Sequence, residues 1–146
     1  MSQRPAGPRI FSVEEANRLL PKVKALLQAL RTQRESLRTL EETVAIVELE
    51  GLQGNGTLSA TAQAKTAEQT TQWHASMETF QEMLSQLDTL GGQLKDLDEG
   101  LIDFFTVHQG QLVYLCWKDG EAAIRYWHPL EDGFSGRRPI TELANN

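Results

Sequence analysis

The feature that most constrains the fold is an apolar repeat, spaced alternately three and four residues apart, between Ala16 and Val47. All of its positions except Gln33 are apolar: Ala16, Leu19, Val23, Leu26, Leu30, Gln33, Leu37, Leu40, Val44 and Val47. This spacing places side chains on one face of an α-helix and is typical of coiled-coil-like packing. Ser12 and Glu15 match a capping box at its start. The repeat therefore predicts one long helix from Ser12, bent at Pro21.

A second helix of similar character is expected after the glycine-rich segment 51–58, which predicts a turn. Its apolar positions are Trp73, Met77, Phe80, Leu84, Leu87 and Leu94. If the chain folds back near residue 55, Leu30 faces Phe80 and Leu26 faces Leu84. The sequence thus predicts a long antiparallel helical hairpin over residues 12–94, preceded by a flexible N-terminus over residues 1–11.

The turn end of this hairpin is less well matched than the other end. Val44, Ile46, Val47 and Leu49 are aliphatic, whereas the facing positions of the second helix are polar. Burying such a side chain fully is worth about 1.5–3 kcal/mol, so a second copy could stabilise itself by covering these residues. We expect a homo-oligomer, a dimer or a higher even number, with these four residues at its interface. The alternative is a frayed, locally repacked tip.

Beyond Gly91-Gly92 the apolar period changes to two, which predicts a small antiparallel β module over residues 95–146. Strands are expected at Leu101–Phe105 and Leu112–Trp117. Asp119-Gly120 predicts a two-residue turn into a return strand at Ala122–Trp127, and Glu131–Pro139 is expected to be a loop. The predicted fold class is α+β.

The two-residue turn decides how the reactive side chains are expected to lie. It pairs Cys116 with Ala123 and places the Cys116 thiol and the His128 imidazole on opposite faces of the sheet. A catalytic pair is therefore not expected, and Cys116 is interpreted as a small core residue. A metal site would need Asp103, His108 or Glu121 beside His128, and their spacing matches no metal motif. No catalytic residue, metal ligand or cofactor is predicted.

The segment from Gly133 to Arg138 is the best candidate for ligand binding. Glycines allow consecutive amides to point one way, and arginine offers a planar pair of donors to a carboxylate or phosphate. The predicted ligand-binding residues for a small anion are Arg137, Gly136, His128, Trp127 and Glu121. Trp127 is expected to be exposed, because the predicted register alternates it away from Ile124. The alternative is a structural loop whose arginines pair with acidic neighbours, namely Glu131, Asp132 or Glu142.

Charge and composition narrow the class of partner. The net charge is −6, and residues 51–99 carry two lysines against seven acidic residues. Nucleic-acid binding is therefore disfavoured. No apolar run is long enough to cross a membrane or serve as a secretory signal. Cys116 is the only cysteine, so no internal disulfide can form. A cytoplasmic location is expected.

Motifs at both ends of the chain resemble one known family. They are Phe11–Asn17 and Leu19–Pro21 near the N-terminus, and Leu94–Leu97, Gly100–Phe104, Val113–Trp117, Gly120-Glu121, Tyr126–His128 and Gly133–Arg137 in the C-terminal part. They are similar to DUF2203, a bacterial family catalogued as a domain of unknown function. The resemblance implies a small prokaryotic cytoplasmic protein and brings no activity, cofactor or catalytic residue with it.

Function is not specified by any of these patterns. The favoured hypothesis is a homo-oligomeric interaction or scaffold protein built on the hairpin. The second hypothesis is a binding module in the β module for a small anion or, less favoured, a metal ion. An enzyme comes third, because no catalytic motif is present.

Overall fold

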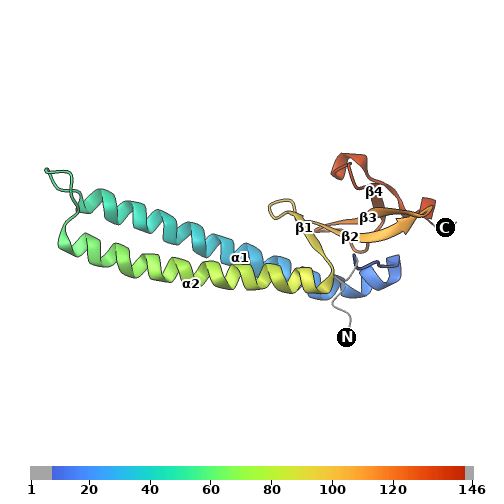
Figure 1. The fold of residues 1–146 in the computed structure, drawn as a ribbon, viewed down its shortest axis with the longest axis horizontal. Helices are drawn as coiled ribbons and strands as arrows, with labels where there is room; N and C mark the ends of the chain where they lie inside the picture. The colour runs from blue at the N-terminus through green and yellow to red at the C-terminus, as the bar shows by residue number, and fades with distance from the viewer. Residues whose placement is uncertain (1–7, 144–146) are drawn as a thin grey trace, which may run out of the picture. The chain divides into compact units, whose positions relative to one another are not determined.

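A computed structural model describes residues 8–143 of the chain. Two helices come first, α1 (Val13–Gly51) and α2 (Ala60–Leu90). Five strands follow: β1 (Gln93–Asp96), β2 (Leu101–His108), β3 (Gln111–Lys118), β4 (Tyr126–Pro129) and β5 (Arg138–Pro139). Short 3-10 turns lie at η1 (Phe134–Gly136) and η2 (Ile140–Leu143). The predicted α+β class, two packed helices followed by an antiparallel sheet, is confirmed (Figure 1).

The contacts divide the chain into two compact units. One comprises residues 28–84, the middle of the helical hairpin. The other comprises, among the described residues, 8–27 and 85–143, including the sheet. None of the helices in residues 8–143 is long and apolar enough to cross a membrane.

The start of α1 is fixed by the capping box that the sequence predicts. The Ser12 amide donates to Glu15 Oε1, and the Glu15 amide donates to Ser12 Oγ, both at 3.0 Å. These bonds satisfy amides that have no partner inside the helix. The helix is continuous through Pro21. Phe11 was predicted to belong to the flexible N-terminus, but its side chain is buried. Its amide donates to the Phe105 carbonyl at 2.8 Å. Residues 1–7 of that segment lie outside the described residues.

Within residues 28–84 the helices pack along the predicted apolar face, with Leu30 and Leu37 buried. Gln33, the polar position of the repeat, is matched by Ser76: its Nε2 donates to the carbonyl and to Oγ of that residue. Near the turn, Val44 and Val47 are half-buried, while Ile46 and Leu49 are 54% and 75% exposed. Whether a second copy covers them stays a prediction.

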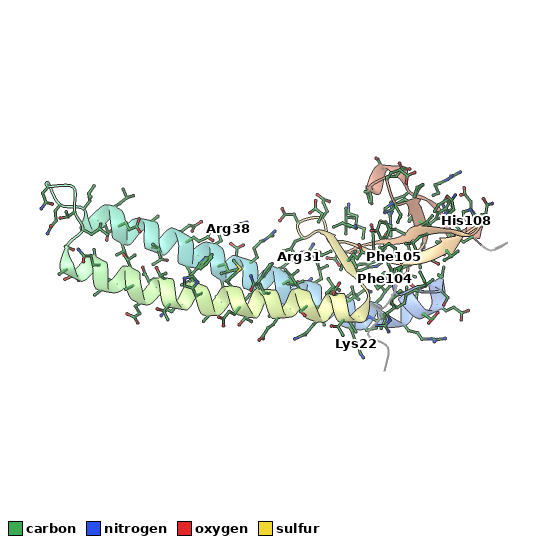
Figure 2. All side chains as sticks on the ribbon, in the orientation of Figure 1. Lys22, Arg31, Arg38, Phe104, Phe105 and His108 are labelled. Atoms are coloured by element: carbon green, nitrogen blue, oxygen red, sulfur yellow. The ribbon has the colours of Figure 1, made fainter. Side chains whose placement is uncertain are left out.

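The sheet has the order β1-β2-β3-β4-β5, with every neighbouring pair antiparallel. Adjacent residues of β2, such as Phe104 and Phe105 (labelled in Figure 2), have their side chains on opposite faces of the sheet. Phe104 packs edge-on against Phe11, with ring centroids 5.4 Å apart. Phe105 stacks on Tyr114 of β3 on the other face, at 4.9 Å. The cluster of polar side chains described in the next subsection lies on the face that carries Tyr114.

The predicted hairpin register between β3 and β4 is wrong. The turn at Asp119-Gly120 does form, since the Glu121 amide donates to the Lys118 carbonyl at 3.0 Å. Strand pairing does not resume at once, however, because residues 119–125 leave the sheet and β4 begins only at Tyr126. Cys116 pairs with Tyr126, not with Ala123. An odd shift of three residues moves every side chain of the return strand to the opposite face.

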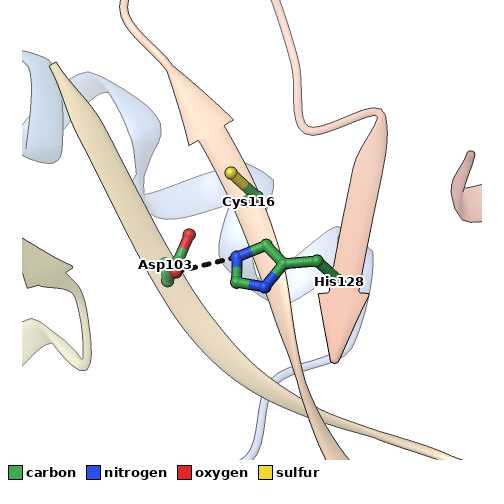
Figure 3. A group of neighbouring side chains, drawn as sticks. All are labelled: Asp103, Cys116 and His128. Atoms are coloured by element: carbon green, nitrogen blue, oxygen red, sulfur yellow. Dashed lines mark hydrogen bonds and ion pairs between the residues drawn. The ribbon is translucent and has the colours of Figure 1, made fainter. Parts of the chain in front are cut away.

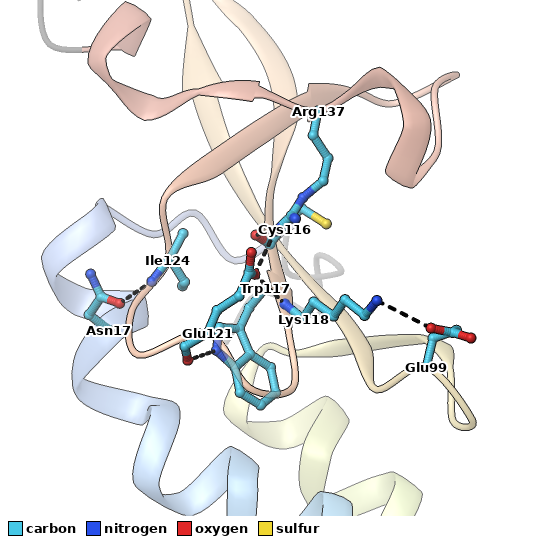
Figure 4. Close-up of polar contacts among 8 residues, drawn as sticks. All are labelled: Asn17, Glu99, Cys116, Trp117, Lys118, Glu121, Ile124 and Arg137. Carbon is cyan, nitrogen blue, oxygen red and sulfur yellow. Dashed lines mark hydrogen bonds and ion pairs between the residues drawn. The ribbon is translucent and has the colours of Figure 1, made fainter.

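Contacts with the rest of the chain hold this loop out of the sheet (Figure 4). The Ile124 side chain is buried, and its amide donates to Asn17 Oδ1 at 2.8 Å. The Trp117 indole donates to the Glu121 carbonyl at 2.9 Å.

The structure also differs from the sequence prediction at Glu131–Pro139. This segment was predicted to be a loop, and it contains the 3-10 turn η1 and the short strand β5.

Candidate functional site

Three side chains with metal-binding or proton-transfer chemistry meet on the sheet face that carries Tyr114. Asp103 of β2 lies opposite Cys116 of β3, and His128 of β4 lies opposite Tyr114. Side chains alternate along each strand, so residues directly opposite each other, or two apart, share a face. The expectation that Cys116 and His128 point apart is therefore wrong, and its cause is the misplaced register of β4.

The three residues form a closely packed buried cluster (Figure 3). Asp103, Cys116 and His128 are 2%, 1% and 3% exposed. One potential ligand atom from each lies within 4.8 Å of the other two. His128 Nε2 and Asp103 Oδ2 are 3.0 Å apart, while Asp103 Oδ1 is buried without a hydrogen-bond partner in the described part of the chain. The Cys116 thiol is the neighbouring protein donor to this carboxylate, since a hydrogen bond between the two side chains lowers the pKa of Asp103.

The second imidazole nitrogen fixes the tautomer of His128. Nδ1 lies 2.8 Å from the Pro129 carbonyl oxygen, which can only accept, so Nδ1 carries a proton. The contact between Nε2 and Asp103 Oδ2 then holds one more proton, shared between imidazole and carboxylate. Burial raises the pKa of Asp103 above its ordinary value, and the neighbouring imidazolium form of His128 acts in the opposite direction.

The thiol of Cys116 is not a reactive nucleophile by itself. Burial, reinforced by the Asp103 carboxylate, raises its pKa to about 12. Since the thiolate is the attacking form, the free thiol is inert at neutral pH. His128 directs both nitrogens elsewhere, to Asp103 and Pro129, so it is not bonded to the thiol as a general base. This geometry therefore disfavours nucleophilic catalysis by the Cys116–His128 pair.

The cluster borders a cavity of about 110 Å³. Besides the three residues, its lining comprises Lys95, Leu101, Tyr114, Leu130, Asp132, Gly133 and Phe134. A single water needs only about 10–15 Å³ measured this way, so the cavity can hold a metal ion with a small ligand. Lys95 Nζ donates to Tyr114 Oη at 3.2 Å, and Tyr114 Oη donates to Gln93 Oε1 at 2.9 Å.

The residues predicted to bind an anion are not assembled into one site. Arg137 and Glu121 bind each other, at 2.6 Å, and the same guanidinium donates to the Cys116 carbonyl at 3.1 Å (Figure 4). It also lies over the rings of Tyr126 and Phe134. Arg137 therefore pairs with an acidic residue, as expected if the loop is structural, but this residue is Glu121. Glu142, one of the acidic residues expected to pair with the loop arginines, pairs with Arg138.

Gly136 contacts Asp132 at the edge of the cavity, whereas Trp127, opposite Leu115, lies on the other face of the sheet from the buried cluster. A Cβ at Gly136 would meet the Asp132 side chain at 2.6 Å, so glycine there permits a close packing contact. Trp127 is only 4% exposed, and the expectation of an exposed indole is wrong, because the observed register pairs Trp127 with Leu115 and turns its side chain to the face that carries this buried leucine. Trp127 borders a separate cavity of about 310 Å³ together with His108 and Arg138.

The sequence analysis named Asp103 as a possible ligand beside His128 but did not place Cys116 with them, and it predicted no metal site. The available signal was a carboxylate inside the buried run Leu101–Phe105, where apolar residues surround it on both sides. A charged residue in such a run is seldom buried without a partner. Its partners could not be assigned without the register of β4.

Comparisons with known proteins identify the family alone. The family model described as "Uncharacterized conserved protein (DUF2203)" matches residues 9–140, nearly the whole chain. No curated protein matches, and no solved structure matches.

Proposed function

The chain belongs to the DUF2203 family, and we propose that it binds one divalent transition-metal ion, with zinc as the reference ion, through Asp103, Cys116 and His128. The observation that carries the proposal is the buried meeting of a carboxylate, a thiol and an imidazole, with one potential ligand atom of each within 4.8 Å of the other two. Nitrogen, sulfur and oxygen donors of this kind are the usual ligands of zinc and its neighbours.

The hydrogen bonds around the cluster favour a metal ion. Nδ1–H of His128 donates to the Pro129 carbonyl, which leaves Nε2 to face the cluster. Metal-binding histidines characteristically hold their second nitrogen in this way. A metal ion would replace the proton between Nε2 and Asp103 Oδ2 and would hold Cys116 as the thiolate despite its raised pKa. Two positive charges would offset two buried negative charges.

Direct metal binding tests this proposal. Native mass spectrometry and calorimetry on the metal-free protein should find one Zn²⁺ per chain. Cys116→Ala and Asp103→Asn should each weaken binding by more than the roughly 10–100-fold typical of losing an outer-shell partner. His74→Gln, which removes an exposed histidine of α2, is the matched control and should leave the affinity unchanged. Circular dichroism checks the fold of each variant. Equal zinc affinity in wild type and Cys116→Ala would contradict the proposal.

The expected prokaryotic cytoplasmic location belongs to the same proposal. A reducing compartment would keep the single cysteine as a thiol available to a metal ion. Purification under reducing conditions with metal analysis of the untreated protein would show which ion the cell supplies.

Self-association through the hairpin tip is the second candidate function. It is supported by the exposure of Ile46 and Leu49 on one helix, beside half-buried Val44 and Val47. Scaffolding by such an oligomer and metal binding by the sheet are compatible, because they use different residues.

A further inference from the structure

We infer that a metal ion held by Asp103, Cys116 and His128 keeps one coordination position open to a small monoanion, with Lys95 as the charge partner of that anion. The inference rests on the proposed metal site and names the class of molecule it would take. Zinc is almost always four-coordinate, and sites with three protein ligands complete the set with water or an exogenous ligand.

No fourth protein ligand is within reach in the described part of the chain. The group of ligand atoms that lie within 4.8 Å of one another contains Asp103, Cys116 and His128 only. Asp132 also borders the cavity, but it is exposed, and its carboxylate packs at the position where Gly136 lacks a side chain. The open position would therefore face the cavity of about 110 Å³, which has room for one small ligand.

A β-bulge places Lys95 at this cavity. In β1, Leu94 pairs with Ile102 and Asp96 with Leu101, so Lys95 is the additional residue without a partner across the strands. Bulges of this kind commonly redirect a side chain towards a site. The Lys95 ammonium lies 4.4 Å from the centre of the Tyr114 ring and donates to its hydroxyl. An ammonium has three donors, so donors remain for a ligand.

The open position and the donors beside it decide which ligand fits. A divalent ion with one thiolate and one carboxylate ligand is neutral, and the other charged groups at the cavity are one ammonium, Lys95, and one carboxylate, Asp132, both exposed. Leu101, Leu130 and Phe134 make part of the cavity wall apolar, while Lys95 is exposed and stands at the solvent side of the cavity. A monoanion that binds the metal through one oxygen or nitrogen and accepts from Lys95 would satisfy both groups. A small carboxylate meets these requirements.

Cobalt substitution makes the open position visible. Co²⁺ takes similar sites, and its visible absorption changes with the number and type of its ligands. The protein loaded with Co²⁺ is titrated with sodium azide and with sodium acetate, and the spectrum is recorded. We expect both anions to shift the bands. Lys95→Met should weaken their binding roughly tenfold or more, because a charge-assisted hydrogen bond is lost, while the affinity for Co²⁺ stays within a few-fold of wild type.

The controls separate this inference from the metal site itself. Lys22→Met removes one exposed lysine of α1 and should leave anion binding unchanged. If Co²⁺ does not bind the wild type, the proposed function fails. If Co²⁺ binds but neither anion alters its spectrum, the open position is overturned and the metal site stands. If the anions bind equally well to wild type and Lys95→Met, the role of Lys95 is overturned.

Discussion

Cys116 is a residue whose surroundings determine its chemistry. Burial raises the pKa of its thiol from 9.0 to about 12, and Asp103 adds to the shift. The native protein therefore keeps the thiol proton at a pH where the unfolded chain has lost it. The stabilising effect is complete below about pH 9 and is lost as the pH rises towards 12.

Alkaline unfolding of the metal-free protein should show this effect. Between pH 9 and pH 11 the free energy of unfolding should fall on account of this thiol, with a slope that reaches at most about 1.4 kcal/mol per pH unit. Cys116→Ala should lack that component, so its stability should depend less on pH over the same interval. Urea titrations at pH 8 and pH 10.5, with a chelator present, measure the difference. Parallel losses in the two proteins would show that the thiol is not held protonated.

Arg137 is expected to act through structure. Its side chain is 11% exposed and is bonded to Glu121 and to the Cys116 carbonyl. Arg137→Lys should lower the free energy of unfolding by about 1–3 kcal/mol, since lysine cannot make both bonds in the same plane. Arg138→Lys is the control, because Arg138 is 55% exposed in its pair with Glu142 and should cost no more than about 0.5 kcal/mol. Urea unfolding measures both, and zinc affinity should be unchanged in each.

A ligand role for Arg137 would give the opposite pattern. Anion binding to the metal-loaded protein would then fall in Arg137→Lys while its stability stayed close to that of the wild type.

Among the elements, α2 has an end that depends on one glycine. The Gly92 amide donates to the Leu87 carbonyl at 3.1 Å and the Gly91 amide to the Asp88 carbonyl at 2.9 Å, which is a Schellman end. Gly91 has φ of +95°, and a Cβ there would collide with the Phe11 ring. Both the backbone conformation and the packing of Phe11 therefore require glycine.

Gly91→Ala should destabilise the protein through two separable costs. The left-handed backbone costs about 1–2 kcal/mol for a residue with a Cβ, and the displaced Phe11 ring adds a further cost of about 1–3 kcal/mol. Gly110→Ala shares the positive φ, +75°, but has open space around the new Cβ, so it should show the first cost alone. Thermal and urea unfolding compare the two. Equal losses would mean that the Phe11 ring moves aside freely.

Elements that follow from local pattern were predictable, and those set by distant contacts were not. The capping box of Ser12 and the apolar repeat from Ala16 onward specify α1 through interactions within a few residues. The loop 119–125 depends on Asn17, which is 107 positions away from Ile124. Asp119-Gly120 indicates a tight hairpin by its own propensity, and the tertiary contact overrides it.

The same distinction applies to the candidate site. Each of Asp103, Cys116 and His128 could be singled out by its chemistry, but their meeting depends on two strand registers. Pairing of β2 with β3 follows from the short turn at Gln109-Gly110. Pairing of β4 is set by the loop that sequence reasoning misplaced, and one odd shift was enough to separate Cys116 from His128.

At the scale of the whole molecule, we expect the protein to self-associate through the exposed tip of the hairpin. Ile46 and Leu49 are more exposed than large aliphatic side chains usually are, and they lie beside Val44 and Val47. A stable interface should bury more than about 1,000 Å² in total. Acidic side chains flank these four residues on α1, namely Glu42, Glu48 and Glu50. Two such tips would repel each other while their apolar side chains attract.

Self-association should therefore strengthen with salt. Light scattering at high micromolar concentration should give a dimer or a higher even-numbered oligomer, and the dissociation constant should fall as ionic strength rises, because salt screens the repulsion between glutamates. Ile46→Asp should disrupt assembly, since it removes apolar area and adds charge. Ala45→Asp adds the same charge beside it without removing a large side chain, so it should weaken assembly much less. A monomer mass for the wild type at high concentration and high salt would mean that these four residues tolerate exposure to water.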